Sequence, residues 1–144
     1  MRWNVRGPEL LVADYQAAKA FYRDIFGFRL RFERAEDRFG YFELAGAQLM
    51  LLLQEPGAVA CGLDQPGPKG RGLHFQVEVP TIADLLARLA GAAIELHSPV
   101  SESWYRVDAC EHGQREFFVS DPDAYLFRFF EYLGERAACG AQLE

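Results

Sequence analysis

The sequence predicts an α+β domain built from two tandem β-α-β-β-β modules. Two observations predict it. The same order of strand and helix periodicities can be read twice along the 144 residues, and a stretch rich in glycine and proline separates the two readings. We expect one domain over residues 1–134, with modules at about 8–54 and 72–132, a linker at about 55–71, and a frayed tail at 135–144. Identity between the halves is low, so the repeat is one of pattern. A ferredoxin-like α+β domain is the alternative, but it would not need the pattern twice.

The first module begins with a short apolar strand at residues 9–13. Asp14 follows as a good helix N-cap, and Gly27 is placed to end the helix. Between them, apolar residues recur at helical spacing: Ala18, Phe21, Tyr22 and Ile25. Three further strands are predicted, at 28–33, 39–44 and 48–53.

The second module repeats this order. Residues 73–79 alternate as a strand, Thr81 is expected to cap a helix, and Gly91 is expected to end it. Three further strands are predicted, at 93–96, 114–120 and 125–131. The polar segment 98–113 between the first two of them is predicted to be a long loop.

A tight turn is predicted at Asp121-Pro122-Asp123, between two segments rich in aromatic and branched residues. Pro122 presets φ for the first corner, and the Asp121 side chain can accept hydrogen bonds from the backbone that follows. Ala124 follows the turn, which suggests a turn type that does not require positive φ at this position.

Composition limits the possible partners. The net charge of −6 argues against nucleic acid and anionic membranes, and is compatible with a cationic ligand. Cys61, Cys110 and Cys139 are odd in number and lack zinc-site spacing, as expected of reduced thiols in the cytoplasm. No apolar run is long enough to cross a bilayer, so we expect a cytoplasmic protein.

Several short motifs occur in an order typical of one family. Trp104-Tyr105-Arg106 is followed by Gly113-Gln114-Arg115-Glu116-Phe117 and then by Asp121-Pro122-Asp123, and the segment 46–51 reads as a further strand of the same pattern. Over residues 8–134 the chain resembles the glyoxalase/bleomycin resistance protein/dioxygenase (vicinal oxygen chelate) superfamily, closest to its bleomycin-resistance-like branch. The resemblance implies a U-shaped mixed β-sheet around a cavity, and a homodimer whose cavities are lined by both modules.

Metal-using members of that family hold a divalent ion with four side chains, usually His or Glu, on four strands. The corresponding positions here are Gly7, Met50, His74 and Arg128, of which only His74 is a usual ligand. The resemblance therefore implies a binding protein that needs no cofactor. The alternative is a lyase, isomerase or extradiol-type dioxygenase that uses one Ni, Zn, Mn or Fe ion.

The predicted function is non-covalent binding of a small, flat or cationic molecule. No catalytic residue is predicted. Trp104 or Tyr105, in the predicted loop, can stack on a flat ligand. Glu9 lies two positions from Gly7 on the same strand, so its side chain shares the face of Gly7. Each of these side chains also has a purely structural interpretation: core packing, a loop anchor, or a cross-sheet pair between Glu9 and Arg128. The predicted ligand-binding residues are Glu9, Met50, His74, Trp104, Tyr105 and Arg128.

Overall fold

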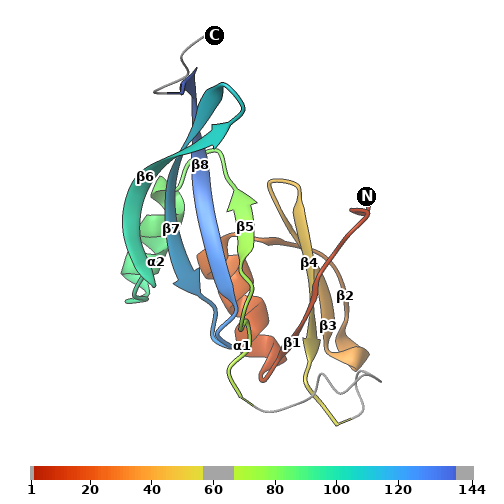
Figure 1. Cartoon of the computed structure of the whole chain (residues 1–144). Coiled ribbons are helices and arrows are strands. Elements are labelled where there is room, and N and C mark those ends of the chain that lie inside the picture. The colour runs from red at the N-terminus through yellow and green to blue at the C-terminus, as the bar shows by residue number, and fades with distance from the viewer. Residues whose placement is uncertain (1, 57–66, 139–144) are drawn as a thin grey trace.

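The computed structural model describes residues 2–56 and 67–138, and contains two four-stranded mixed sheets (Figure 1). The strand orders are β1-β4-β3-β2 and β5-β8-β7-β6, so each module forms its own sheet with its first strand at one edge. These two edge strands lie near the middle of the molecule (Figure 1). The predicted fold class, two β-α-β-β-β modules, is confirmed.

The first module contains a strand, a helix that continues as a π-helical segment, and three antiparallel strands. In chain order these are β1 (Glu9–Val12), α1 (Tyr15–Ala20), η1 (Phe21–Phe26), β2 (Arg29–Arg34), the 3₁₀ turn η2 (Ala35–Asp37), β3 (Phe39–Leu44) and β4 (Ala47–Leu53). Asp14 is the N-cap, because its Oδ1 accepts from the backbone N–H of Ala17 at 3.0 Å. Gly27 ends the helix with φ +85°, as the sequence predicts.

The second module repeats the order with longer strands. It contains β5 (Phe75–Glu78), α2 (Ala83–Gly91), β6 (Ser98–Val107), β7 (Cys110–Ser120) and β8 (Leu126–Ala137). Helix α2 has no side-chain cap at Ile82; instead, the Glu131 carboxylate on β8 accepts from the backbone N–H of Ile82 at 2.8 Å. Thr81 contributes only a 3.3 Å contact to the N–H of Ala83.

Three predictions for the C-terminal half of the chain are wrong. The expected loop at 98–113 is strand β6 and the start of β7, which form a long hairpin. No strand lies at 93–96. Strand β8 runs to Ala137, so it includes residues 135–137 of the expected tail, because its last residues pair with the start of β7, Ala137 with Cys110. The remaining tail and most of the linker lie outside the described residues.

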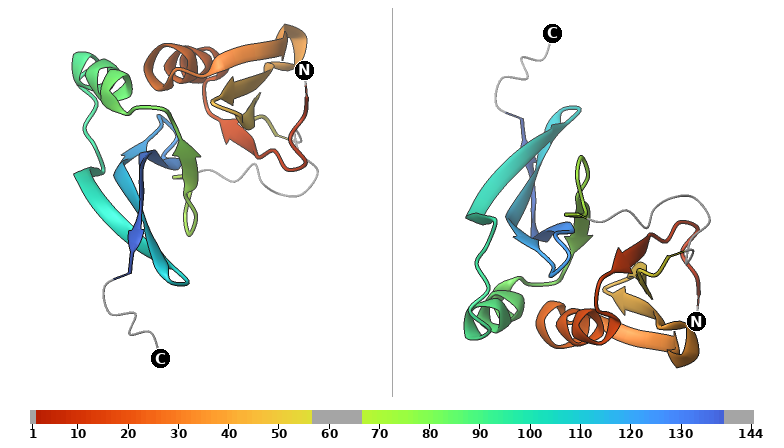
Figure 2. Two further views of the ribbon diagram at one scale, coloured as in Figure 1. Left: turned by 90° about the horizontal axis from the view of Figure 1, so that it is seen from above. Right: turned by 90° about the horizontal axis from the view of Figure 1, so that it is seen from below.

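Both helices lie on the same side of the molecule and cover one face of each sheet (Figure 2). The core between helices and sheets is rich in aromatic rings. Tyr22, Phe26, Phe127 and Phe129 are fully buried there, and Phe26 contacts both Phe127 and Phe129 at ring-centroid distances of about 5 Å. Because Phe26 belongs to the first module and its two partners to the second, the modules share one core.

The Asp121-Pro122-Asp123 turn joins the two modules. Asp121 Oδ2 accepts from the buried Tyr22 hydroxyl at 2.8 Å, and Asp123 Oδ1 accepts from the N–H of Ala13 at 2.9 Å. The Tyr125 hydroxyl donates to the carbonyl of Leu11 at 3.0 Å. The turn predicted from sequence is therefore also a hydrogen-bonded contact between the modules.

The prediction that this turn avoids positive φ is wrong. Ala124 has φ +68°, in the left-handed region, and its N–H donates to the carbonyl of Asp121 at 3.1 Å. The N–H of Tyr125 also reaches Asp121 Oδ1, at 2.8 Å. These bonds require the chain to turn back at residue 124, and an alanine adopts that conformation at a steric cost.

Candidate functional site

The open face of the C-terminal sheet carries a cluster of hydrogen-bonded polar side chains around the buried Glu116. Arg128 of β8 donates from Nε to Glu116 Oε2 at 2.9 Å and from its terminal nitrogen to Gln114 Oε1 at 2.8 Å. The Tyr105 hydroxyl of β6 donates to the other Glu116 oxygen at 2.6 Å. We call Tyr105, Gln114, Glu116 and Arg128 the Arg128 cluster. Residues 105, 114, 116 and 128 meet because these positions share one face of neighbouring strands.

Burial makes this cluster electrostatically distinctive. The Glu116 and Arg128 side chains are 7% and 14% exposed, and their closest nitrogen–oxygen distance is 2.6 Å. The guanidinium also lies 4.9 Å from the Tyr105 ring centroid. Burial and the hydrogen bond to Glu116 raise the pKa of the Tyr105 phenol, so it stays protonated as a donor. A carboxylate and a guanidinium thus neutralise each other within a low-dielectric setting.

Of the predicted site residues, this arrangement brings together Tyr105 and Arg128. The expected alternative pairing of Arg128 with Glu9 is wrong, because Arg128 pairs with Glu116 on the neighbouring strand. Glu9 is exposed on β1, and it has no ion-pair partner within residues 2–56 and 67–138. Its register partner across the parallel β1–β4 pair is Met50.

His74 lies just before β5, at the edge of the same sheet as the Arg128 cluster. Its ring stands edge-on to Phe118, with centroids 5.3 Å apart, and Phe118 is the register partner of Arg128. The imidazole is exposed and makes no hydrogen bond in the described parts of the chain. It is therefore available to a ligand and does not serve as a buried core histidine.

Met50 lies on the open face of the other sheet. A side chain at Gly7 would meet Met50 Cε at 3.7 Å and the Tyr41 hydroxyl at 3.8 Å, so these three positions adjoin one another. Trp3 packs perpendicular to Tyr41 there, with centroids 4.6 Å apart. The backbone beside it is held by Gln48, whose Nε2 donates to the carbonyl of Arg2 at 2.8 Å.

Trp104 lies on the opposite face of the C-terminal sheet from the Arg128 cluster. It pairs in register with Gly113, where an added Cβ would lie 2.7 Å from the Trp104 ring, and Arg136 lies 4.0 Å from the ring centroid. Adjacent residues of a strand point to opposite faces, so Trp104 and Tyr105 cannot both face the Arg128 cluster.

Sequence reasoning missed two contributors, Gln114 and Trp3. Gln114 could have been found from its spacing, since positions 114 and 116 share one strand face. Nothing in the sequence signals that Trp3, six residues before β1, lies against the sheet. Glu116, which the sequence analysis named only as part of a family motif, is the ion-pair partner of Arg128.

The residues at the family's ligand positions do not fit a divalent ion. Gly7 has no side chain, Met50 offers a thioether, and Arg128 places a cation where a ligand would be needed. Within residues 2–56 and 67–138, no three His, Cys, Asp or Glu side chains are grouped so as to hold a metal ion. In the same residues, no helix is long and apolar enough to cross a membrane.

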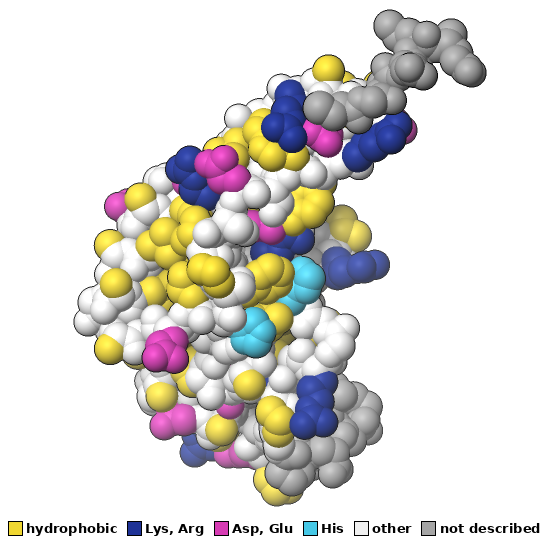
Figure 3. All heavy atoms as spheres, turned by 60° about the vertical axis from the view of Figure 1, so that its left-hand side comes forward, with side chains coloured by type: hydrophobic (Ala, Val, Ile, Leu, Met, Phe, Trp, Pro, Cys, Tyr) yellow, Lys and Arg dark blue, Asp and Glu magenta, His cyan; other side chains and the backbone are white. Residues whose placement is uncertain are grey.

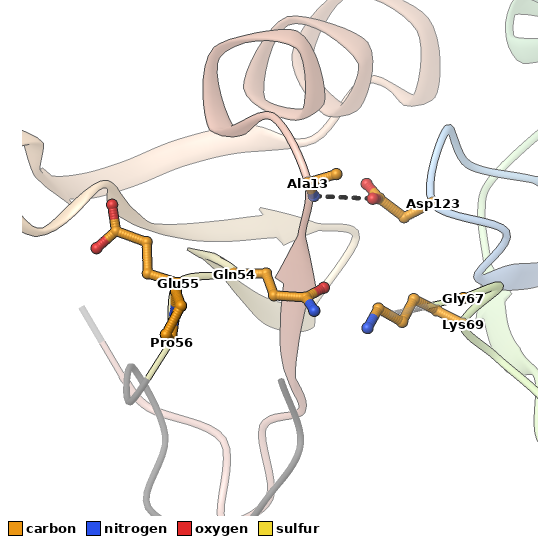
Figure 4. A pocket seen from close by; sticks show the side chains of 7 residues that line it. All are labelled: Ala13, Gln54, Glu55, Pro56, Gly67, Lys69 and Asp123. Carbon is orange, nitrogen blue, oxygen red and sulfur yellow. Dashed lines mark hydrogen bonds between the residues drawn. The ribbon is translucent and has the colours of Figure 1, made fainter. Parts of the chain in front are cut away.

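Two cavities lie between the modules. One, of about 420 Å³, adjoins the module contact and is lined by Gln54, Lys69 and Asp123, with the bond from Ala13 to Asp123 at its edge (Figure 4). The other, of about 280 Å³, is lined by residues of β4 and β5 together with His74. The space-filling view shows two histidine side chains near the middle of the molecule, where its outline is hollowed (Figure 3).

Comparison with known proteins agrees with this architecture. The model of the Glyoxalase/Bleomycin resistance protein/Dioxygenase superfamily matches residues 7–129. The chain belongs to this superfamily. No curated protein sequence matches it significantly.

Solved structures of the superfamily's fold are similar over almost their whole length. TioX from Micromonospora sp. ML1 is 22% identical, with a TM-score of 0.65, over 90% of this chain and 100% of that one. The fosfomycin resistance protein FosX from Listeria monocytogenes is 17% identical, with a TM-score of 0.61, over 91% and 94%. A virulence protein from Salmonella typhimurium is 17% identical, with a TM-score of 0.65, over 92% and 99%. At these identities the likeness concerns the fold alone.

Proposed function

We propose that this superfamily member binds a small organic molecule with a flat or cationic part, and does so without a metal ion. The observation that supports the proposal is the Arg128 cluster: at a position where the family places a metal ligand, a guanidinium is held by Glu116 and Gln114. A cation fixed there by its own counter-ion opposes a divalent ion by charge repulsion.

The chemistry of this face suits recognition of a planar group. Tyr105 is 40% exposed, so part of its ring remains open to stacking while its hydroxyl is held by Glu116. His74 adds an exposed imidazole nearby. A flat ligand would find the exposed part of the Tyr105 ring and the His74 imidazole, and stacking or cation–π contacts with such rings contribute on the order of 1–2 kcal/mol each. FosX, which shares this fold, is a fosfomycin resistance protein, and we propose sequestration of an antibiotic-like molecule as the biological role of this chain.

We further propose that the protein acts as a homodimer, in which Glu9 and Met50 of one sheet and the Arg128 cluster of the other line a common cavity. Each sheet has one face covered by a helix and one face open (Figure 2), and a second copy would cover the open faces. Sedimentation velocity decides this point: a species of twice the 16.3 kDa chain mass is expected, and a monomer at all concentrations would contradict it.

The metal question is tested by native mass spectrometry of the protein as purified, and by equilibrium dialysis against Mn²⁺, Ni²⁺ and Zn²⁺. We expect no stoichiometric metal. One ion per chain that is lost in the His74→Ala variant would overturn the proposal and favour the metal-dependent lyase, isomerase or dioxygenase.

Ligand binding is tested with N-methylquinolinium, a flat cation. We expect it to bind, and the Tyr105→Leu variant to bind about tenfold more weakly, because the stacking ring is lost. Trp104→Phe is the matched control: it alters the neighbouring aromatic residue on the opposite face and should leave the affinity unchanged. Equal weakening in both variants, or no binding to the parent protein, contradicts the proposed site.

A further inference from the structure

Strand β6 forms the outer edge of the C-terminal sheet. In the described parts of the chain it pairs with β7 alone, and no strand lies along its other side (Figure 2). Its hairpin with β7 extends beyond helix α2 (Figure 1), and most of its residues are exposed. Every second residue of such an edge directs its backbone N–H and C=O away from the sheet. Strand β6 therefore presents a row of hydrogen-bonding groups to a further strand.

Two features that protect edge strands from pairing are confined to the start of β6. Pro99 is its second residue, and its register with β7 shifts between Ser98 and Ser101. From Ser101 to Val107 every residue pairs with β7 in an uninterrupted register, without proline or lysine. Strand β2, at the edge of the other sheet, differs because its register shift lies in its middle and it carries three arginines. We call the outer side of Ser101–Val107 the β6 edge.

An acid and a base of the β6 edge, Glu102 and Arg106, are exposed and share one sheet face. Glu102 accepts two hydrogen bonds from Arg115 of β7, at 3.3 and 2.8 Å, and both end on its Oε1. Arg106 donates from Nε to the carbonyl of Asp108 at 3.0 Å, and it forms no ion pair within residues 2–56 and 67–138. The second oxygen of Glu102 and the charge of Arg106 can therefore engage a partner from outside the chain.

The sequence of the β6 edge is complementary to itself in one antiparallel register. When two copies pair about a two-fold axis at Trp104, Glu102 of each copy lies opposite Arg106 of the other, on the same face of the sheet. Opposite charges in directly facing positions stabilise an antiparallel pair. Registers centred on Glu102 or on Arg106 would instead place like charges opposite each other. The charges therefore favour a second copy of this chain as the strand that pairs with the edge.

We propose that the β6 edge pairs antiparallel with the β6 edge of a second copy of this chain, in the register centred on Trp104. The two C-terminal sheets then form one continuous sheet, with both copies of helix α2 on the same side. This contact uses the sheet edge, whereas the homodimer proposed above uses the open faces, so neither contact rests on the other. The short strand pair buries little apolar surface, and the association is therefore weak, with a dissociation constant of about 0.1–1 mM.

Charge reversal, followed by sedimentation velocity over a range of protein concentrations, tests this register. Glu102→Arg and Arg106→Glu each place like charges opposite each other twice, so each variant alone should associate at least about tenfold more weakly than the parent protein. An equimolar mixture of the two variants restores both opposite-charge pairs and should recover the association, as should the double variant. Glu36→Arg and Arg71→Glu make the same charge changes at exposed positions outside β6, and should associate as the parent does.

Amide hydrogen exchange locates the contact. Exchange at Ser101–Val107 should slow as the concentration of the parent protein rises, and should not slow in either single variant. Equal association of the parent, both single variants and their mixture overturns the β6 contact while leaving the open-face homodimer in place. Failure of both the mixture and the double variant to recover the association also overturns it. Protection of these amides that is independent of protein concentration overturns pairing with a second copy and indicates a strand of another origin.

Discussion

Replacing Asp121 with Asn should remove a specific pH dependence of stability. Asp121 is 5% exposed, and burial is the main cause that raises the pKa of its carboxyl from the ordinary 3.8 to about 6. The hydrogen bonds from Tyr22 and from the N–H groups of Asp123 and Tyr125 act in the opposite direction, by favouring the carboxylate. The effect of desolvation on the pKa is larger than the effect of these hydrogen bonds, so the pKa of Asp121 is raised.

The sign follows from which state binds the proton. Between about pH 4 and pH 6 the folded protein holds a proton on Asp121 that the unfolded chain has released. The free energy of unfolding contributed by this group therefore falls as pH rises through that window, and is constant above it. The difference between the two pKa values corresponds to roughly 3 kcal/mol.

Asp121→Asn keeps an oxygen that can accept from the N–H groups of Asp123 and Tyr125, and its amide can donate to the Tyr22 hydroxyl. It has no charge to desolvate. We expect the variant to gain stability relative to the parent protein as pH rises from 4 to 7, by up to roughly 3 kcal/mol. Urea denaturation at pH 4, 5, 6 and 7 measures this difference, and subtracting the parent curve removes the contribution of all other groups.

Tyr22→Phe provides the complementary variant, because the Tyr22 hydroxyl lowers the pKa of Asp121. Its removal should destabilise the protein more at pH 7 than at pH 4. The reasoning is refuted if Asp121→Asn retains the pH dependence of the parent, or if its relative stability falls between pH 4 and pH 6.

Three further substitutions test local features by thermal or urea denaturation. Ala124→Gly relieves a left-handed alanine at φ +68° and should stabilise the protein by about 1 kcal/mol; an unchanged or lower melting temperature would contradict this. Gly40→Ala places a Cβ 2.5 Å from the Tyr15 hydroxyl and should cost about 2 kcal/mol, and a neutral result would mean that β3 shifts freely. Glu116→Gln leaves the Arg128 guanidinium without its counter-ion and should cost about 3 kcal/mol, whereas a loss below about 1 kcal/mol would indicate a solvated pair.

The sequence predicted the elements that bury a regular apolar pattern. Strand β3 was predicted with the bounds observed. Asp14 caps the start of the first helical stretch and Gly27 ends it, as expected. Strand β6 was missed for a physical reason: most of it is exposed on both faces, with a burial pattern that shows no alternation. A strand that extends beyond its helix has no apolar face to signal it, and only its pairing with β7 defines it.

The same error explains which part of the site was predicted. Once residues 98–113 were taken as a loop, both Trp104 and Tyr105 could face a ligand. In a strand they must face opposite ways, and Gly113 leaves room only for Trp104 on its side. The sheet face on which Arg128 lies could be predicted from the sequence, because it depends only on the alternation of side chains along β8. Glu131, three residues later, lies on the other face, where it caps helix α2.

The Arg128 cluster also shows why a metal site is not a single substitution away. Arg128 is held by two side chains of β7, so exchanging it for a carboxylate would place two acids, at 116 and 128, on one face of neighbouring strands beside the buried Glu116. Like charges placed so close repel, which raises the pKa of one carboxyl and disfavours its ionised, metal-binding form. Gln114 would at the same time lose the donor that it now accepts from. Because these positions depend on one another, the guanidinium, carboxylate and amide form one hydrogen-bonded unit, and changing one member alone leaves the others without their partners.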